Sequence, residues 1–240
     1  MQLRTLSVVL LALLLAAMAM VPMVSANPTA HDYDFNNLPD LMVGSTPSAS
    51  GAASVQNTAG YSATSRTNYD ASTAYNGLPS DALFMFIGHG LYSSGGDNGG
   101  GLMFYNGQKS YIYDIRPSSY PVGTVFVTDY SSTQLSNVRL VVLAGCYTGD
   151  TSSTRGNLVS KLYNKGAKNV IGWTGNQNMA KLQSWSSNFW TRTNNGESFY
   201  TAAQNAVSDS YWIWPSGYNG IDNFAFWGGN GFLIPAGYGS

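Results

Sequence analysis

The feature that most constrains this chain is a set of short segments that are apolar at successive positions. Such runs lie within residues 82–88, 138–150 and 168–175, and helical patterns occur at 156–167, 181–196 and 197–210. A strand without polar alternation is buried on both faces, as in a parallel sheet with helices packed on either side. The sequence therefore predicts an α/β fold built on a mainly parallel sheet.

Further elements are expected around these runs. Asn106-Gly107, within GLMFYNGQKSYIYDI, is a strong signal for a β-hairpin. Residues 27–60 are rich in Ser, Ala, Pro, Gly and Asn, so we expect a loose N-terminal segment, with linker or loop at 44–60. The other predicted elements are a short edge strand at 38–44, a short helix at 68–78, a short strand or turn approach at 124–130 and a closing strand at 224–234.

Two of the apolar runs end in residues that can do chemistry. LFMFIGHG contains His89 between Gly88 and Gly90, and LVVLAGCYTG contains Cys146. Sites in parallel sheets lie beyond the carboxyl ends of the strands. If the two strands are neighbours, both side chains open onto one crevice, and the flanking glycines keep bulk away from the histidine.

Cys146 is the only cysteine, and the second histidine, His31, is expected in a mobile N-terminal tail. A single thiol in a secreted chain either pairs with another chain or is kept for its reactivity. Taken singly, a cysteine at a strand end is usually a small buried apolar residue, and a histidine in a glycine-rich turn is often a plain loop residue. Their shared position at strand ends favours a catalytic pair.

The pair suits acyl transfer. Cysteine attacks a carbonyl carbon as the thiolate, and an imidazole can accept the thiol proton and later protonate the leaving amine. The oxyanion needs backbone N–H donors, for which Gly90 and Cys146 are the candidates. Motifs for a serine-hydrolase elbow, a phosphate loop or a Cys/His metal site are absent, so no cofactor is expected. The glycine-rich loop around Asp97 and Asn98 could instead bind calcium, but it lacks the ligand spacing of a calcium loop, and a plain surface loop is the favoured interpretation.

Residues 1–26 are expected to be a signal peptide. Arg4 precedes a 14-residue apolar run, and Val24-x-Ala26 resembles a signal-peptidase site. The run is shorter than the roughly 18–20 residues of a spanning helix, and no later segment could span a membrane. We therefore expect a secreted or cell-surface protein, an uncleaved N-terminal anchor being the alternative.

The mature chain would carry 10 basic and 12 acidic residues without a basic patch. This balance argues against nucleic acid as a partner.

An apolar strand ending in His-Gly, followed by an apolar strand that runs into Cys, resembles the caspase-like (clan CD) cysteine peptidases. These include caspases, gingipains, clostripain, legumains, separases and CHAT domains. LVVLAGCYTG is most similar to the CHAT form, and NLVSKLYNKGAKNVIGWTG, FWTRTNNGESFYTAAQNA and FAFWGGNG resemble the later elements in the same order. The resemblance covers about residues 60–235, which leaves 1–26 as signal peptide, 27–60 as loose segment and 61–240 as peptidase domain.

The resemblance implies a three-layer sandwich, with a sheet of about six strands and helices on both faces. It implies Cys146 as nucleophile, His89 as general acid/base and an oxyanion hole from the Gly90 and Cys146 amides. Substrates would be peptides or proteins cut after one chosen residue.

The chain departs from the family at two positions beside the nucleophile. Gly145 stands where many members have Ala or Ser, and Ala144 stands where some have an acidic pocket residue. Asp97 and Asp150 are the remaining candidates to line a pocket that binds a basic substrate residue. The short N-terminal part puts the first strand of the sheet in doubt.

Two hypotheses from different classes follow. The first is a secreted cysteine endopeptidase that uses the His89/Cys146 dyad. The second is a catalytically silent caspase-like domain that binds a surface partner or a cell-envelope component. Other hydrolases or acyl transferases on the same dyad, including a sortase-like use in surface processing, remain open, and nothing in the sequence indicates an oligomeric state.

Overall fold

The computed structural model describes residues 26–34, 46–92, 100–116, 118–151, 156–211, 220–229 and 231–233. The helices are α2 (Thr46–Thr58), α3 (Ala71–Gly77), α4 (Leu158–Asn164), α5 (Met179–Asn194) and α6 (Phe199–Tyr211), with 3-10 turns at Leu78–Ser80, Val127–Asp129 and Gly220–Asp222. The strands are β1 (Thr29–Asp34), β2 (Ser62–Thr67), β3 (Asp81–Ile87), β4 (Gly90–Tyr92), β5 (Gly100–Tyr105), β6 (Lys109–Tyr113), β7 (Thr124–Phe126), β8 (Leu140–Ala144), β9 (Asn169–Trp173) and β10 (Phe224–Gly228).

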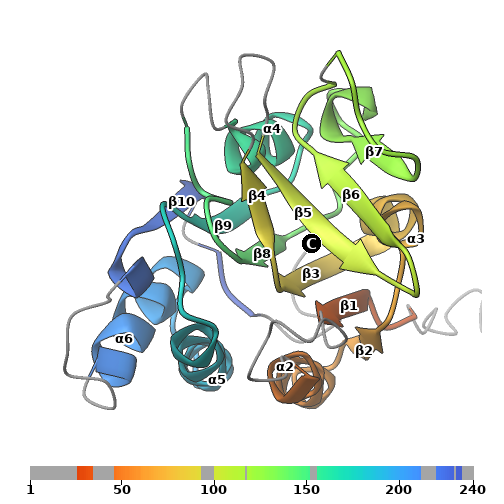
Figure 1. Cartoon of the computed structure of the whole chain (residues 1–240). Helices are drawn as coiled ribbons and strands as arrows, with labels where there is room; N and C mark the ends of the chain where they lie inside the picture. Colours follow the sequence, from red (N-terminus) through yellow and green to blue (C-terminus); the bar gives the residue numbers. More distant parts are fainter. Residues whose placement is uncertain are drawn as a thin grey trace, which may run out of the picture.

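Six strands form the main sheet, in the order β10-β9-β8-β3-β1-β2 (Figure 1). All neighbouring pairs are parallel except β10, which runs antiparallel to β9. The prediction of an α/β fold with a mainly parallel sheet of about six strands is confirmed.

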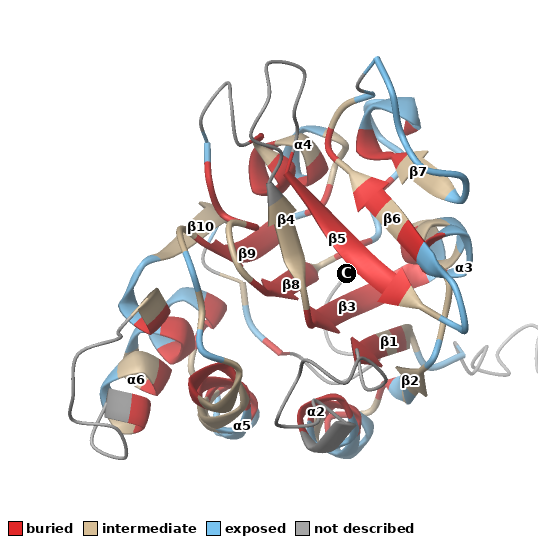
Figure 2. Ribbon diagram, viewed as in Figure 1, coloured by how far each residue is buried: buried red, intermediate tan, exposed pale blue. Residues whose placement is uncertain are grey.

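The central strands are buried along their whole length, as Figure 2 shows for β3, β8 and β9. Successive side chains of a strand point to opposite faces. Leu83, Met85 and Ile87 pack in the core shared with α2, α5 and α6, whereas Phe84 and Phe86 pack in the core shared with α3, α4 and β5. One apolar run therefore supplies two cores, which is why these strands show no polar alternation.

A second sheet, β4-β5-β6-β7, lies over the α3 and α4 face of the main sheet (Figure 1). Its centre is the hairpin predicted around Asn106-Gly107, in which β5 and β6 are antiparallel and Gly107 has a φ of +99°. That left-handed conformation is open to glycine at little cost. The structure also confirms the helices predicted within 68–78, 156–167, 181–196 and 197–210 and the strands predicted within 82–88, 124–130, 138–150, 168–175 and 224–234.

The prediction of a loose segment at 27–60 is wrong for its described parts, residues 27–34 and 46–60. β1 lies between β3 and β2, so the sheet begins at residue 29 rather than after residue 60, and the first strand is present. α2 packs on β1 and β2, and its Ala49, Ala52 and Ala53 are buried. Small side chains let the helix approach the sheet closely, so a composition typical of a linker here forms a packed helix.

A buried polar contact fixes α2 to β1. Gln56 Nε2 donates to Asp32 Oδ1 at 2.9 Å, and both side chains are fully buried. Burial raises the pKa of Asp32 well above its usual value, against the opposing effect of this hydrogen bond.

His31 does not lie in a mobile tail. It is part of β1, with Nδ1 2.7 Å from Asp81 Oδ1 of β3 and Nε2 2.9 Å from an Arg66 amino group of β2. A guanidinium only donates, so Nε2 is the acceptor and Nδ1 carries the proton toward Asp81. The imidazole thus joins the three strands.

Two further predictions for the N-terminal region fall outside the described residues. These are the edge strand at 38–44 and nearly all of the signal peptide. Within the described ranges, no helix is both long and apolar enough to cross a membrane.

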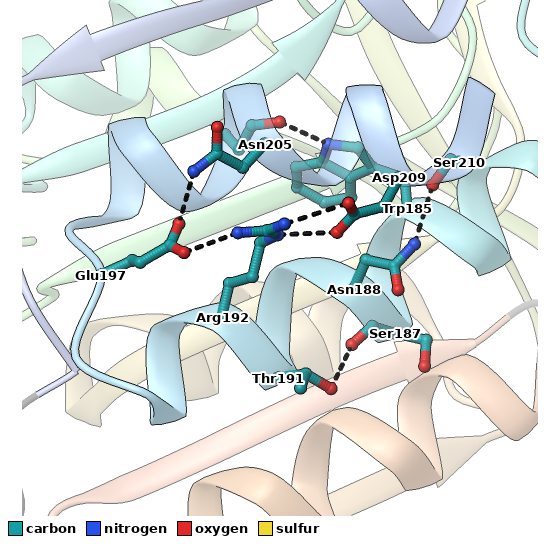
Figure 3. A network of polar contacts seen from close by, with 10 residues as sticks. Trp185, Ser187, Asn188, Thr191, Arg192, Glu197, Asn205, Asp209 and Ser210 are labelled. Atoms are coloured by element: carbon teal, nitrogen blue, oxygen red, sulfur yellow. Dashed lines mark hydrogen bonds and ion pairs between the residues drawn. The ribbon is translucent and has the colours of Figure 1, made fainter. Parts of the chain in front are cut away.

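Helices α5 and α6 lie side by side and are joined by a polar network (Figure 3). Arg192 donates to both carboxylate oxygens of Asp209, at 2.7 and 3.0 Å, and to Glu197 at 2.6 Å. Asn205 donates to the other oxygen of Glu197 at 2.9 Å. The hydrogen bonds from Arg192 lower the pKa of Asp209.

Replacing Asp209 by Asn removes the ion pair with Arg192 and should lower the free energy of unfolding near neutral pH. The loss should be only about 0.5–1 kcal/mol, because the pair is partly exposed and screened by solvent. The pKa of Asp209 is lower in the folded chain than its usual 3.8, so the stabilisation is present above that pH and is lost as the pH falls through the folded pKa. Urea unfolding of wild type and Asp209→Asn at neutral and strongly acid pH measures it. A stability difference that is the same at both pH values would contradict the ion pair.

Candidate active site

The two strands that end in His89 and Cys146 are adjacent and parallel, as expected. Ile87 pairs with Ala144, and partners along this ladder differ by 57 positions. The pairing continues past β3, because Gly88 N–H donates to Ala144 O at 3.0 Å. His89 and Cys146 each stand two residues beyond the Ile87–Ala144 pair, after the carboxyl ends of neighbouring strands.

The loops after β3 and β8 touch through their main chains. A Cβ on Gly90 would lie 1.8 Å from Cys146 O, and a Cβ on Gly145 would lie 2.7 Å from Gly88 O. No side chain fits at either position without moving the backbone. The departure from Ala or Ser at position 145 therefore has a steric cause, and Gly90 is required by its contact with Cys146.

Cys146 is partly exposed, and its sulfur is bound to the loop that follows β9. Gln177 N–H donates to Sγ at 3.2 Å. The next residue, Tyr147, has a φ of +59°, which is rare outside glycine and costly for a bulky side chain. Its N–H donates to Gly175 O at 2.9 Å, so the β9 loop also holds the strained residue in place.

Thr148 and Gly149 fix the chain beyond the cysteine. The buried Thr148 hydroxyl lies 2.6 Å from Leu143 O and accepts from Trp173 N–H at 3.0 Å. A Cβ on Gly149 would lie 2.7 Å from Gly172 of β9. The Thr-Gly pair after the cysteine therefore bonds β8 to β9 and sets the path of the loop.

His89 lies where the two sheets meet. It is partly exposed, and its carbonyl accepts from Met103 N–H of β5 at 3.0 Å. Gly90, the next residue, begins β4. The histidine backbone is thus tied to the small sheet on one side and to the β8 loop on the other.

The two predicted substrate-pocket carboxylates have different outcomes. Asp150 is nearly buried, and its Oδ1 accepts from Gly175 N–H at 3.3 Å, which links the β8 and β9 loops. Asp97, together with the candidate calcium-binding loop around it, lies outside the described residues. Among the residues that are described, no group of three or more His, Cys, Asp or Glu side chains could hold a metal ion.

Asp34 lies at the same edge of the sheet and was not anticipated from the sequence. It ends β1, is buried, and pairs in register with Ile87, two positions before His89. The available signal was a carboxylate at the end of the segment TAHDYD. The sequence does not single it out, because the composition of 27–60 predicts a loose segment.

No protein-family model and no curated protein sequence matches this chain. Solved structures match it in fold. The Arg-specific cysteine proteinase gingipain R (RGPB) has a TM-score of 0.57 at 14% identity, over 86% of this chain and 47% of that one. A complex of RgpB pro- and mature domains from Porphyromonas gingivalis has a TM-score of 0.51 at 14% identity, over 86% and 48%. The Drosophila initiator caspase Dronc has a TM-score of 0.50 at 8% identity, over 87% and 81%.

These likenesses establish the architecture. The chain has a caspase-like α/β fold, and it spans about half the length of the gingipain structures that it matches. Similarity to the CHAT form in particular stays a prediction.

Replacing Thr148 by Val should lower the free energy of unfolding by about 1–3 kcal/mol, because it removes the acceptor of a buried N–H at Trp173. Chemical denaturation measures the loss. Thr148→Ser keeps the hydroxyl and is the matched control, which should retain most of the stability. A larger loss in Thr148→Ser than in Thr148→Val would mean that the methyl group matters more than the hydrogen bonds.

Proposed function

We propose that this chain is a cysteine endopeptidase that uses Cys146 and His89. The observation that carries the proposal is the parallel pairing of β3 with β8, because His89 and Cys146, the only cysteine, each follow the carboxyl end of one of these neighbouring strands. The caspase-like fold supports it, and one structure of that fold is described as an Arg-specific cysteine proteinase. The strained residue after Cys146 is a further support, because backbone strain clusters at functional sites.

In the proposed reaction, the Sγ–H proton of Cys146 passes to the His89 imidazole, and the thiolate attacks the scissile carbonyl carbon. The new C–S bond converts the carbonyl oxygen to an oxyanion. The C–N bond then breaks, and the His89 imidazolium gives its proton to the leaving amine. Water, with His89 as base, attacks the thioester and releases the acid and the thiol.

The oxyanion would be bound by the N–H groups of Gly90 and Cys146. The packing of the glycines is the support for this role. A Cβ on Gly90 would lie 2.9 Å from Cys146 N, and a Cβ on Gly145 would lie 2.9 Å from Gly90 N. Both amide nitrogens therefore lie where the two loops contact each other. Loss of one such donor typically slows catalysis by about 10²–10³-fold.

The proposed substrates are peptides or proteins, without a cofactor. Asp97 and Asp150 stay the candidates for recognition of a basic residue before the scissile bond. Asp150 already accepts a hydrogen bond from Gly175 N–H, which links the two loops. Asp150 is therefore the weaker of the two candidates for binding a basic substrate residue.

Cys146→Ala and His89→Ala should each reduce peptide hydrolysis by about 10⁴-fold or more without unfolding the protein, as expected for a nucleophile and its base. Hydrolysis of a mixed peptide library, with circular dichroism as the folding control, measures both effects. Activity that survives Cys146→Ala would refute the mechanism.

Peptidyl acyloxymethyl ketones with Arg, Lys, Asp, Asn, Leu or Met before the reactive group should give one adduct, read by intact mass. Cys146 is the only cysteine, so Cys146→Ala shows whether the adduct lies on it. The adduct should disappear in His89→Ala and should favour one residue of the panel. If no probe reacts under reducing conditions with calcium present, the silent binding domain replaces the peptidase.

We also propose, on the sequence of residues 1–26, that the chain is secreted or displayed at the cell surface after cleavage. Expression of the full chain in a secreting host should yield a mature N-terminus at Asn27, measured by intact mass. Ala26→Arg alters the small residue before the cleavage site and should leave the leader attached. A wild-type chain that keeps residues 1–26 in the membrane fraction would instead identify an uncleaved anchor.

A further inference from the structure

The loop between β9 and α5 is bound to the nucleophile loop at several points. Tyr147 N–H donates to Gly175 O at 2.9 Å, and Gly175 N–H donates to Asp150 Oδ1 at 3.3 Å. On its other side, Thr174 N–H donates to Asn223 O at 2.8 Å. The two loops therefore form one unit rather than two independent segments.

Gln177 occupies a fixed place in this unit. Its Nε2 donates to Thr174 O at 3.1 Å, and a Cβ on Gly220 would lie only 2.5 Å from that Nε2. The next residue, Asn178, caps α5 by accepting from Lys181 N–H at 3.2 Å. With its neighbours held on both sides, the Gln177 N–H is aimed at Cys146 Sγ, 3.2 Å away.

We infer that the main-chain N–H of Gln177 is a positioning group for the nucleophile: it directs Cys146 Sγ and donates to the sulfur once its proton has left. This inference rests on the proposed function. A thiolate can only accept hydrogen bonds, and a bond to a charged acceptor is about twice as strong as one to a neutral acceptor. The thiol also donates to Gln177 O at 3.8 Å, so the carbonyl holds the neutral thiol, and once the proton has left, the N–H is the contact that favours the thiolate. The Gln177 side chain contributes only indirectly, through its hydrogen bond to Thr174 O.

The test removes the donor without touching the cysteine. Gln177→Pro lacks the N–H, and Gln177→Ala, which keeps it, is the matched control. Iodoacetamide labelling of Cys146, followed by intact mass, should be about 10- to 100-fold slower in Gln177→Pro. Gln177→Ala keeps the N–H and loses only the side-chain bond to Thr174 O, so it should react much faster than Gln177→Pro. In peptide hydrolysis, Gln177→Pro should lower kcat and leave KM nearly unchanged.

A second variant covers the case in which proline disturbs folding. Gly220→Ala keeps the N–H of residue 177, but its Cβ would lie 2.4 Å from Asn176 O, so the β9 loop must move. It should slow labelling less than Gln177→Pro does. Thermal unfolding identifies misfolded variants. If only Gly220→Ala folds, its labelling rate is the test of the inference.

The outcomes separate this inference from the proposed function. Labelling needs no peptide substrate, so slower labelling in Gln177→Pro supports the inference even if the wild type cleaves nothing, in which case only the peptidase proposal fails. Labelling as fast as wild type in folded Gln177→Pro, or in Gly220→Ala when the proline variant does not fold, overturns the inference. Faster labelling also overturns it, and would show that the loop covers the thiol instead.

Discussion

The hydrogen-bonded pairing of β3 with β8 is the interaction on which the rest of this structure depends. Both strands are buried on both faces, so their N–H and C=O groups have no water to bind and must pair with neighbouring strands. A slip by one residue would turn every side chain to the other core, and the two cores are made of different residues. The register is therefore fixed by packing throughout the strands, and His89 and Cys146 each follow the carboxyl end of one of them.

Beyond the strands, the candidate site is held mainly by main-chain contacts. Gly90 and Gly145 allow the two loops to touch, and the Thr148 hydroxyl bonds the Cys146 loop to β9. Few of these contacts specify a large side chain. A fold secured in this way can persist while most side chains change, in keeping with 14% identity to gingipain R and 8% to Dronc.

The N-terminal elements show how packing overrides composition. α2 is made largely of Ser, Ala and Gly, which gives a weak helical signal in sequence. Its stability comes from burial of alanines on the sheet and from the Gln56–Asp32 contact, neither of which is local. His31 is a similar case, because Arg66 and Asp81, its partners on β2 and β3, are 35 and 50 residues away.

The sequence by itself determined the α/β class, the Asn106-Gly107 hairpin and the positions of His89 and Cys146 at strand ends. These features follow from local patterns: continuous apolar runs, turn residues and glycines next to reactive side chains. Only the tertiary structure decided the place of β1, the helix at Thr46–Thr58, the hydrogen bond of Asp150 to Gly175 and the approach of Gln177 to the sulfur. Those features depend on contacts between segments far apart in the chain, and the register that brings the segments together is set by core packing rather than by any one segment.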